Sequence, residues 1–221
     1  VCFQNLNVKI IGFGSGLSNS TLGPSHHSTE DISVLSSLPN LTILSPCCPL
    51  ETEKAIKEAY EIVGPVYIRI GLCGEPEIEQ ARLGFLKGKN NTILPGTDIA
   101  IFSTGTIITE VLGAADLLKN KDISARVINV NTLKPIDRNN IIKNSSTIKY
   151  MVSVEEHNII GGLGSLIESV IVQEQLDVKL IKIGLIDCFA KGYGTQLDLQ
   201  KVNGLDRIGI FDTIVRQIEN L

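Results

Sequence analysis

The chain has 221 residues, of which 43% are hydrophobic and 20% charged, as expected for a globular protein with one large domain or two small ones. The net charge of −4 argues against a nucleic-acid surface, and no run approaches the ~20 apolar residues of a membrane span. The five cysteines show no CxxC spacing, so we expect reduced thiols and a cytoplasmic protein. The first residues carry no signal-peptide pattern, and the missing initiator Met suggests that the chain starts inside a longer protein.

Strand and helix signals alternate through the first 70 residues. A β-branched run at 7–12 predicts a buried strand that leads into a glycine-rich loop. Ser28 is a candidate N-cap with Asp31 three residues later, a variant of the capping box. Pro49 suits the first turn of a second helix that runs to residue 63, and further strands are expected at 41–44 and 66–70.

From residue 73 to 96 the pattern fades into Gly, Pro and Asn punctuation, which we interpret as a linker that could hold a small hairpin. Alternation then resumes to the end of the chain. The predicted strands are 98–103, 125–131, 149–154 and 179–184, and the predicted helices are 107–118, a short one after the turn at 134–137, 165–175, 195–202 and 206–220. This alternation with short loops indicates an α/β fold with mostly parallel sheets.

The loop that follows the first strand holds the densest group of reactive side chains. It combines alternating glycines with the adjacent His26 and His27, just ahead of the predicted helix start. Unpaired N–H groups and the helix dipole favour anions there and disfavour imidazolium, so a neutral imidazole could polarise a carbonyl or hydroxyl. Alternatively, one histidine caps the helix and the other is solvated. Metal binding is a weaker interpretation, because no third ligand is placed by the sequence.

Two later motifs also admit two interpretations each. The run Gly161-Gly162-Leu163-Gly164 could cradle a phosphate, but it lacks the dinucleotide and P-loop spacings, so close helix–strand packing is the favoured explanation. Glu155-Glu156-His157 at the end of a predicted strand could form a proton relay or a subunit contact, or it could be a solvated strand end.

The order of these motifs resembles the transketolase family. Gly-Pro-Ser-His-His-Ser-Thr-Glu-Asp at 23–31, Leu-Pro-Asn at 38–40, Leu-Ser-Pro at 44–46 and Gly-Pro-Val-Tyr-Ile-Arg at 64–69 resemble its pyrimidine-binding domain. Thr-Leu-Lys-Pro-Ile-Asp at 132–137 and the motifs at 154–157 and 161–164 resemble its C-terminal domain. The series covers nearly the whole chain and is most similar to the C-terminal subunit of split transketolases.

The resemblance implies a pyrimidine-binding portion at 1–72, the linker at 73–96 and a C-terminal domain at 97–221, each domain a three-layer α/β unit. It also implies a transferase that uses thiamine diphosphate and Mg²⁺ to pass a two-carbon ketol unit from a ketose to an aldose. By motif position, His26 would be the catalytic residue in the substrate channel. Ser25, His27 and Arg69 would be substrate-binding neighbours.

Three departures from the family pattern qualify this expectation. The segment before the first strand is too short to carry the family's cofactor-activating glutamate, and the GDG signature for diphosphate and Mg²⁺ is absent. The chain alone should therefore be inactive and need an N-terminal domain or subunit, in a homodimer or heterotetramer. Leu22 and Leu72 stand where many relatives have Asp and Arg that recognise a phosphorylated sugar.

Two other functions remain open from the resemblance. One is the beta chain of a 2-oxoacid dehydrogenase or a 1-deoxyxylulose-5-phosphate synthase-like enzyme. The other is a non-catalytic assembly module. In each case we expect neither nucleic acid nor membrane as a partner.

Overall fold

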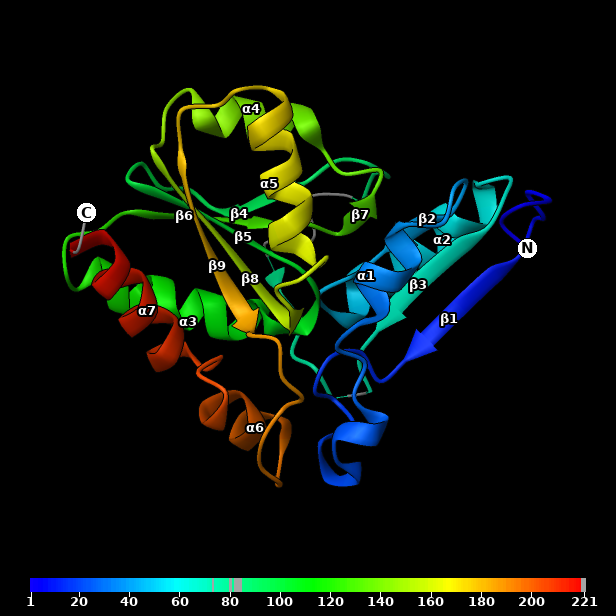
Figure 1. Ribbon diagram of the computed structural model, residues 1–221, viewed down its shortest axis with the longest axis horizontal. Coiled ribbons are helices and arrows are strands. Elements are labelled where there is room, and N and C mark those ends of the chain that lie inside the picture. The colour runs from blue at the N-terminus through cyan, green and yellow to red at the C-terminus, as the bar shows by residue number, and fades with distance from the viewer. Residues whose placement is uncertain (73, 80, 82–84, 220–221) are drawn as a thin grey trace.

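The computed structural model describes residues 1–72, 74–79, 81 and 85–219 and contains two sheets that lie side by side (Figure 1). The strands are β1 (Lys9–Phe13), β2 (Thr42–Leu44), β3 (Val66–Ile70), β4 (Asn91–Leu94), β5 (Ile99–Ser103), β6 (Ala125–Asn129), β7 (Thr132–Lys134), β8 (Tyr150–Asn158) and β9 (Lys179–Leu185). The α-helices are α1 (Asp31–Ser36), α2 (Pro49–Glu61), α3 (Ile108–Lys119), α4 (Arg138–Ser145), α5 (Leu163–Gln173), α6 (Gln196–Val202) and α7 (Arg207–Glu219). No helix in these described ranges is both long and apolar enough to cross a membrane.

The first sheet has the strand order β1-β3-β2-β7. β3 pairs in parallel with both β1 and β2, so the carboxyl ends of these three strands meet at one edge of the sheet. β7 pairs antiparallel with β2, although it lies beyond the predicted linker. The second half of the chain therefore completes the first sheet, which ties the two halves together.

The second sheet has the order β4-β6-β5-β8-β9, and all its pairs are parallel except β4 with β6. α4 and α5 cover one face and α3 and α7 cover the other (Figure 1). Alternate residues of β5 enter the two cores: Ile99 and Ile101 pack with α3 and α7, whereas Ala100 and Phe102 pack with α5. Burial on both faces explains the unbroken apolar run of this strand. The predicted α/β fold with mostly parallel sheets is confirmed.

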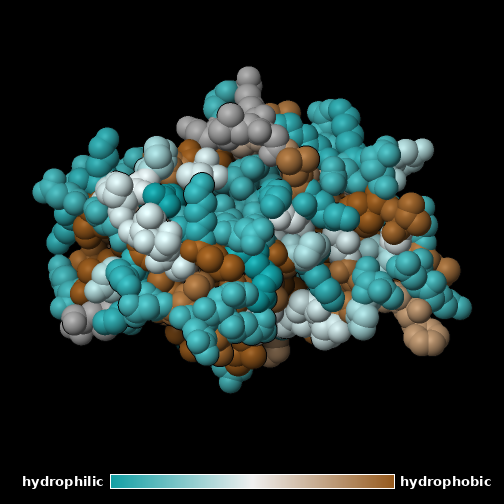
Figure 2. Space-filling model, turned by 90° about the horizontal axis from the view of Figure 1, so that it is seen from above, coloured by the Kyte–Doolittle hydropathy of each residue, from teal (hydrophilic) through white to brown (hydrophobic). Residues whose placement is uncertain are grey.

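β1 differs from its prediction as a buried strand. It lies at the edge of the first sheet and leaves Ile10, Ile11 and Phe13 exposed by 44%, 53% and 61%. Hydrophobic residues also reach the surface as separate patches on the face shown in Figure 2, between broad hydrophilic areas. A β-branched run predicts a strand, but its neighbours decide how much of that strand is buried.

The start of α1 also differs from the prediction. The N-cap is Glu30, whose side chain makes no capping hydrogen bond, and the capping box at Ser28 is therefore wrong. The backbone of Ser28 instead forms a short antiparallel bridge with Gly16, with N···O distances of 3.0 and 3.1 Å. That bridge closes the loop between β1 and α1, so Ser28 stays extended one turn before the helix begins.

The predicted linker contributes a strand rather than a hairpin where it is described. β4 joins the edge of the second sheet and pairs with β6. Residues 73, 80 and 82–84 of that stretch lie outside the described residues. Cys2, Cys47, Cys48 and Cys188 are free thiols, and Cys73 lies outside the described part.

Candidate functional site

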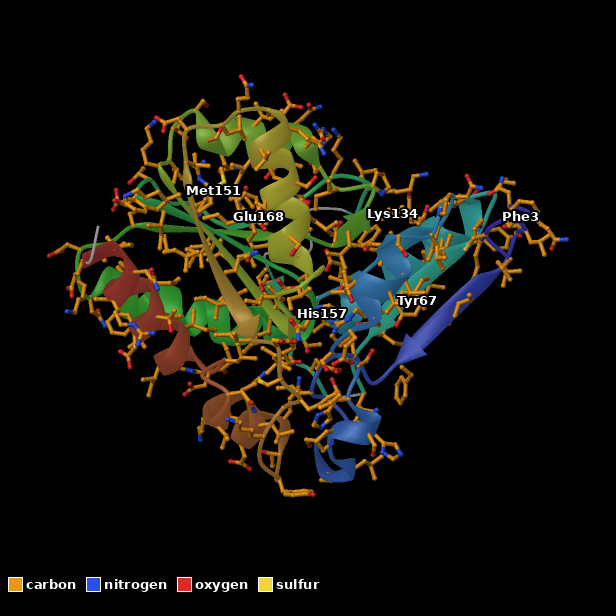
Figure 3. The ribbon with its side chains drawn as sticks, in the orientation of Figure 1. Phe3, Tyr67, Lys134, Met151, His157 and Glu168 are labelled. Carbon is orange, nitrogen blue, oxygen red and sulfur yellow. The ribbon has the colours of Figure 1, made fainter. Side chains whose placement is uncertain are left out.

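The candidate site lies where the carboxyl edge of the first sheet meets the end of β8 in the second. In parallel α/β sheets this edge is the usual place for ligand-binding loops. The main loop here comprises residues 14–30, between β1 and α1, and is called the histidine loop below. Figure 3 shows His157 at the end of β8, close to the start of α1 and to this loop.

The histidine loop contains two short 3-10 helices, η1 (Ser20–Leu22) and η2 (Pro24–His26). Gly23 joins them with a φ of 79°, a conformation that a residue with a side chain rarely adopts. His26 N donates to Gly23 O at 3.0 Å, and Asn19 Nδ2 donates to His26 O at 3.3 Å. The backbone around His26 is therefore held by the loop itself.

The His26 side chain is exposed to solvent at the surface of this loop. Its Nδ1 lies 3.1 Å from Oγ of the equally exposed Ser25. This hydrogen bond occupies one ring nitrogen, so Nε2 is the nitrogen that remains for other partners. The arrangement brings together two of the predicted site residues.

His27 is partly buried beside His26, and neither of its buried ring nitrogens has a hydrogen-bond partner among the described residues. Burial lowers the pKa of His27, and the positive charge of a protonated His26 would lower it further, while Glu30 opposes the change. A neutral imidazole with unmade hydrogen bonds is thus present in the loop. Such a group is available to a ligand that supplies a donor or an acceptor.

The histidine at the start of α1 is His157, which no pattern in the sequence placed there. Its Nε2 accepts from the amides of Ile32 at 3.2 Å and Ser33 at 3.5 Å, and its Nδ1 lies 2.6 Å from Asn158 O. Nδ1 therefore carries the proton and donates to that carbonyl. Burial lowers the pKa of His157, so the imidazole is neutral. The neutral imidazole expected at this helix start exists, but it comes from the second sheet.

Arg69 is buried and its contacts are internal. Its Nε donates to Asp31 at 2.9 Å, and its Nη2 donates to the carbonyls of Ser28 at 3.0 Å and Glu156 at 3.1 Å. Burial by itself would raise the pKa of Asp31, but Arg69 and a hydrogen bond from Tyr67 hold it below its usual value. Contact of Arg69 with a substrate remains a prediction, whereas its role in joining the loop, α1 and β8 is visible.

The strand-end motif Glu155-Glu156-His157 is buried, with exposed fractions of 0%, 3% and 0%, so a solvated strand end is excluded. Glu155 accepts from the amides of Leu163 at 2.6 Å and Gly164 at 2.8 Å. These are the free N–H groups at the start of α5, where the sequence could have placed a phosphate. An internal carboxylate fills that position, and it is stabilised there by the helix dipole.

Close packing explains the glycines after β8. A Cβ at Gly162 would lie 2.0 Å from Glu155 Oε2, and one at Gly164 would lie 2.6 Å from Ser153 Oγ. The favoured interpretation of this run, close helix–strand contact, is therefore confirmed. Burial raises the pKa of Glu155 to about 7 despite the helical amides that oppose the change.

Glu156 points the other way, toward the histidine loop and α6. Its carboxylate accepts from Leu17 N at 3.3 Å, from Gln196 Nε2 at 2.9 and 3.0 Å and from Gln200 Nε2 at 2.6 Å. Burial raises the pKa of Glu156, although these donors oppose the change. No local pattern around residue 156 indicates these contacts, since its partners lie 40 to 139 positions away.

Two neighbouring cavities of about 290 and 490 Å³ open beside this junction. They share Leu72, Glu75 and Thr106, and Cys48 lines the smaller one. A hydrogen bond from Cys47 lowers the pKa of Cys48 to about 6, although burial opposes the change. Among the residues that the structure describes, no group of three or more His, Cys, Asp or Glu side chains is placed to hold a metal ion.

Comparisons with known proteins match two parts of the chain to family models. Residues 1–71 match the family model of the transketolase pyrimidine-binding domain, and residues 88–210 match that of the transketolase C-terminal domain. The chain is 36% identical to one of the subunits of apulose-4-phosphate transketolase from Actinobacillus succinogenes, over 96% of this chain and 68% of that protein. It is 35% identical to a putative transketolase C-terminal section of Methanocaldococcus jannaschii, over 99% of this chain and 69% of that protein.

A solved structure shows the same fold. The chain is 33% identical to a split-gene transketolase described as an inactive beta4 tetramer, with a TM-score of 0.88 over 98% of this chain and 68% of that one. It is also 34% identical to 1-deoxy-D-xylulose-5-phosphate synthase of Chlorobium phaeovibrioides, but over only 34% of that protein. The chain therefore belongs to the transketolase family, as a C-terminal part of a thiamine-diphosphate-dependent, transketolase-like transferase.

Proposed function

We propose that this chain forms one wall of a transketolase active site and that a separate N-terminal domain or subunit supplies the other wall. The reaction is the transfer of a two-carbon ketol unit from a ketose to an aldose. The observation that carries the proposal is His26, exposed on a loop at the carboxyl edge of parallel strands and hydrogen-bonded through Nδ1 to Ser25. Its free Nε2 is the group that would meet a sugar oxygen.

The donor set of this chain suits part of the site. Ser25, His26 and His27 carry hydrogen-bonding groups that suit hydroxyl and carbonyl oxygens, and the two unpartnered nitrogens of His27 leave room for further hydrogen bonds. A diphosphate with Mg²⁺ needs oxygen ligands gathered around the metal. The described residues offer no such cluster, so we place the diphosphate and Mg²⁺ with the partner.

Bound thiamine diphosphate supplies the carbanion chemistry that breaks and makes the C–C bond. This chain positions the sugar and moves protons. His26 Nε2 hydrogen-bonds to a hydroxyl or carbonyl oxygen of the donor sugar and exchanges a proton with it, while Ser25 orients the ring through Nδ1. A second ring, His27, stays neutral because of its burial and extends the hydrogen-bonding wall.

The substrate is a sugar that this chain binds without the Asp and Arg contacts that many relatives make to a hydroxyl and a phosphate. Leu22 is exposed and Leu72 lines the cavities beside the loop, so neither position offers a charge. Relatives are named for apulose-4-phosphate and for 6-deoxy-6-sulfo-D-fructose, which shows that subunits of this family serve different sugars. We place the assembled enzyme in the cytoplasm, in carbohydrate metabolism, as a homodimer or heterotetramer.

The test combines the chain with an N-terminal transketolase subunit, thiamine diphosphate and Mg²⁺. We expect ketol transfer between a ketose and an aldose in the mixture and none with the chain alone. A 2-oxoacid dehydrogenase-type beta chain would instead support 2-oxoacid decarboxylation in the same mixture. Decarboxylation without ketol transfer would reject the proposal in favour of that alternative.

His26→Ala in the assembled enzyme should lower kcat/KM by about 10²- to 10⁴-fold, the usual contribution of a positioned acid–base group. Thr21→Ala is the matched control, because it lies exposed on the same loop and should keep activity within about twofold. Activity of the His26 variant within a few-fold of wild type would favour the non-catalytic assembly module.

A further inference from the structure

The histidine loop is held by the end of β8 at several points. Glu156 Oε2 accepts from Leu17 N at 3.3 Å near the start of the loop. Near its end, Asn158 N donates to Thr29 O at 2.8 Å. Arg69 Nη2 donates hydrogen bonds to the carbonyls of both Ser28 and Glu156. Both ends of the loop therefore meet the same short segment of the second sheet.

Gly16 lies directly on Glu156. A Cβ at Gly16 would come within 2.5 Å of Glu156 Oε2 and 2.6 Å of Glu156 Cβ, and the φ of Gly16 is +59°. The backbone of Gly16 also forms the two-bond bridge to Ser28, which is two residues after His26. Gly16 thus connects Glu156 to the segment that carries His26.

Both side-chain oxygens of Glu156 must act as hydrogen-bond acceptors. Its side-chain partners are the amide of Leu17 and the side-chain amides of Gln196 and Gln200, and all of them donate. A glutamine at this position would turn an NH₂ group toward at least one of these donors. The buried Glu156 carboxylate therefore joins the histidine loop to α6 in a way that an uncharged isostere cannot.

We propose that Glu156, contributed by the C-terminal domain, is the positioning residue that holds the histidine loop and, through Gly16 and Ser28, fixes His26 in the site. It acts on the reaction only through His26, so its kinetic consequence rests on the proposed function. The C-terminal domain then has a part in catalysis without touching the substrate.

The experiment compares Glu156→Gln with Glu155→Gln in the assembled enzyme. The two residues are adjacent, chemically identical and both buried, but the hydrogen bonds of the Glu155 carboxylate go to the start of α5 rather than to the loop. In Glu156→Gln, amide hydrogen exchange in residues 15–28 should rise about tenfold or more, because hydrogen bonds to a charged group are lost. In Glu155→Gln, faster exchange should be confined to the start of α5.

The kinetic result should follow the exchange result. Glu156→Gln should lower kcat by about tenfold or more with KM within about threefold, because a displaced catalytic group mainly costs transition-state stabilisation. The double variant Glu156→Gln/Gln200→Glu returns a carboxylate to the same cluster and should recover most of both effects. Unchanged loop exchange in Glu156→Gln, or equal effects of the two single variants, would overturn the proposal.

Gly16→Ala tests the same contact from the loop side if Glu156→Gln does not fold. Gly204→Ala is its control, because Gly204 also has a positive φ but a Cβ there would meet no atom within 4 Å. Faster amide exchange near Ser28 is expected in the Gly16 variant alone. Equal exchange in the two glycine variants would contradict the proposed positioning of the loop by Glu156. Absence of ketol transfer in the wild-type mixture would instead reject the proposed function. The exchange data would still test whether Glu156 holds the loop.

Discussion

The two sheets differ in how much of each is exposed to solvent. The second is covered by helices on both faces, and Ile101 in its central strand β5 is fully buried. The first has three parallel strands, an exposed edge at β1, and a fourth strand that it takes from the second half of the chain. We call the helix-covered second sheet the closed region, and the first sheet with the histidine loop, which carries the exposed His26, the open region.

The polar groups follow the same division. Glu155, Glu156 and His157 are buried at the end of β8, and each binds backbone amides of another segment. On the open side, Ser25 and His26 bond to each other and face solvent. The polar groups of the closed region therefore hold structure, whereas those of the open region are exposed, and we propose that they bind a ligand. The following substitutions test this difference, from the largest expected effect to the smallest.

Arg69→Met should remove a buried connection between the two regions. It would leave Asp31 buried without its cation and remove the Nη2 donor shared by Ser28 and Glu156, which costs about 3–5 kcal/mol for a broken buried pair. Arg138→Met is the control, since the Arg138–Glu174 pair is about 40% exposed and should contribute less than about 1 kcal/mol. Urea unfolding measures both. A loss below about 1 kcal/mol for Arg69→Met would show that the two regions are not joined there.

The same substitution in each sheet should give different losses of stability. Ile101→Ala in β5 removes a fully buried side chain and should lower the free energy of unfolding by about 2–5 kcal/mol. Ile11→Ala in β1 removes one that is 53% exposed and should cost less than about 1 kcal/mol. Equal losses in urea unfolding would mean that the β1 edge is covered in solution.

The pH dependence of stability should reveal the buried carboxylate of Glu155. Its folded pKa of about 7 lies above the ordinary value of 4.5, so its contribution to stability is complete below pH 4.5 and is lost as pH rises through 7. Across that range the wild type should lose up to about 3 kcal/mol relative to Glu155→Gln. Chemical unfolding of both proteins at several pH values measures the difference, and a constant difference would contradict the raised pKa.

Local patterns in the sequence are enough to predict most elements of the fold. Alternating strand and helix signals place β5, β8, β9 and the helices around them, and Pro49 marks the start of α2 correctly. The errors concern contacts made far along the chain. The burial of β1 and the membership of β7 depend on which strands pair, and no local pattern specifies that pairing.

The site shows the same limit. His26 and Ser25 can be singled out because they are adjacent in an unusual loop. His157 and Glu156 bind segments 125 and 139 positions away, so the sequence shows their motif but not their partners. The spacing of Ser28 to Asp31 suits a helix cap, yet Arg69 and Gly16 hold those two residues in other contacts.

Ser25→Ala addresses the open region and should have the smallest effect. It removes the hydrogen bond to His26 Nδ1 but leaves the loop backbone and the contact with Glu156 in place. Stability should change by less than about 0.5 kcal/mol, because both side chains are exposed. Activity of the assembled enzyme should fall about three- to tenfold, since an unoriented imidazole reaches its productive position less often. Ser25→Thr keeps the hydroxyl and should retain most of the activity. If Ser25→Ala lowered stability more than activity, the hydroxyl would serve the fold. The division between the closed and the open region would then fail at this residue.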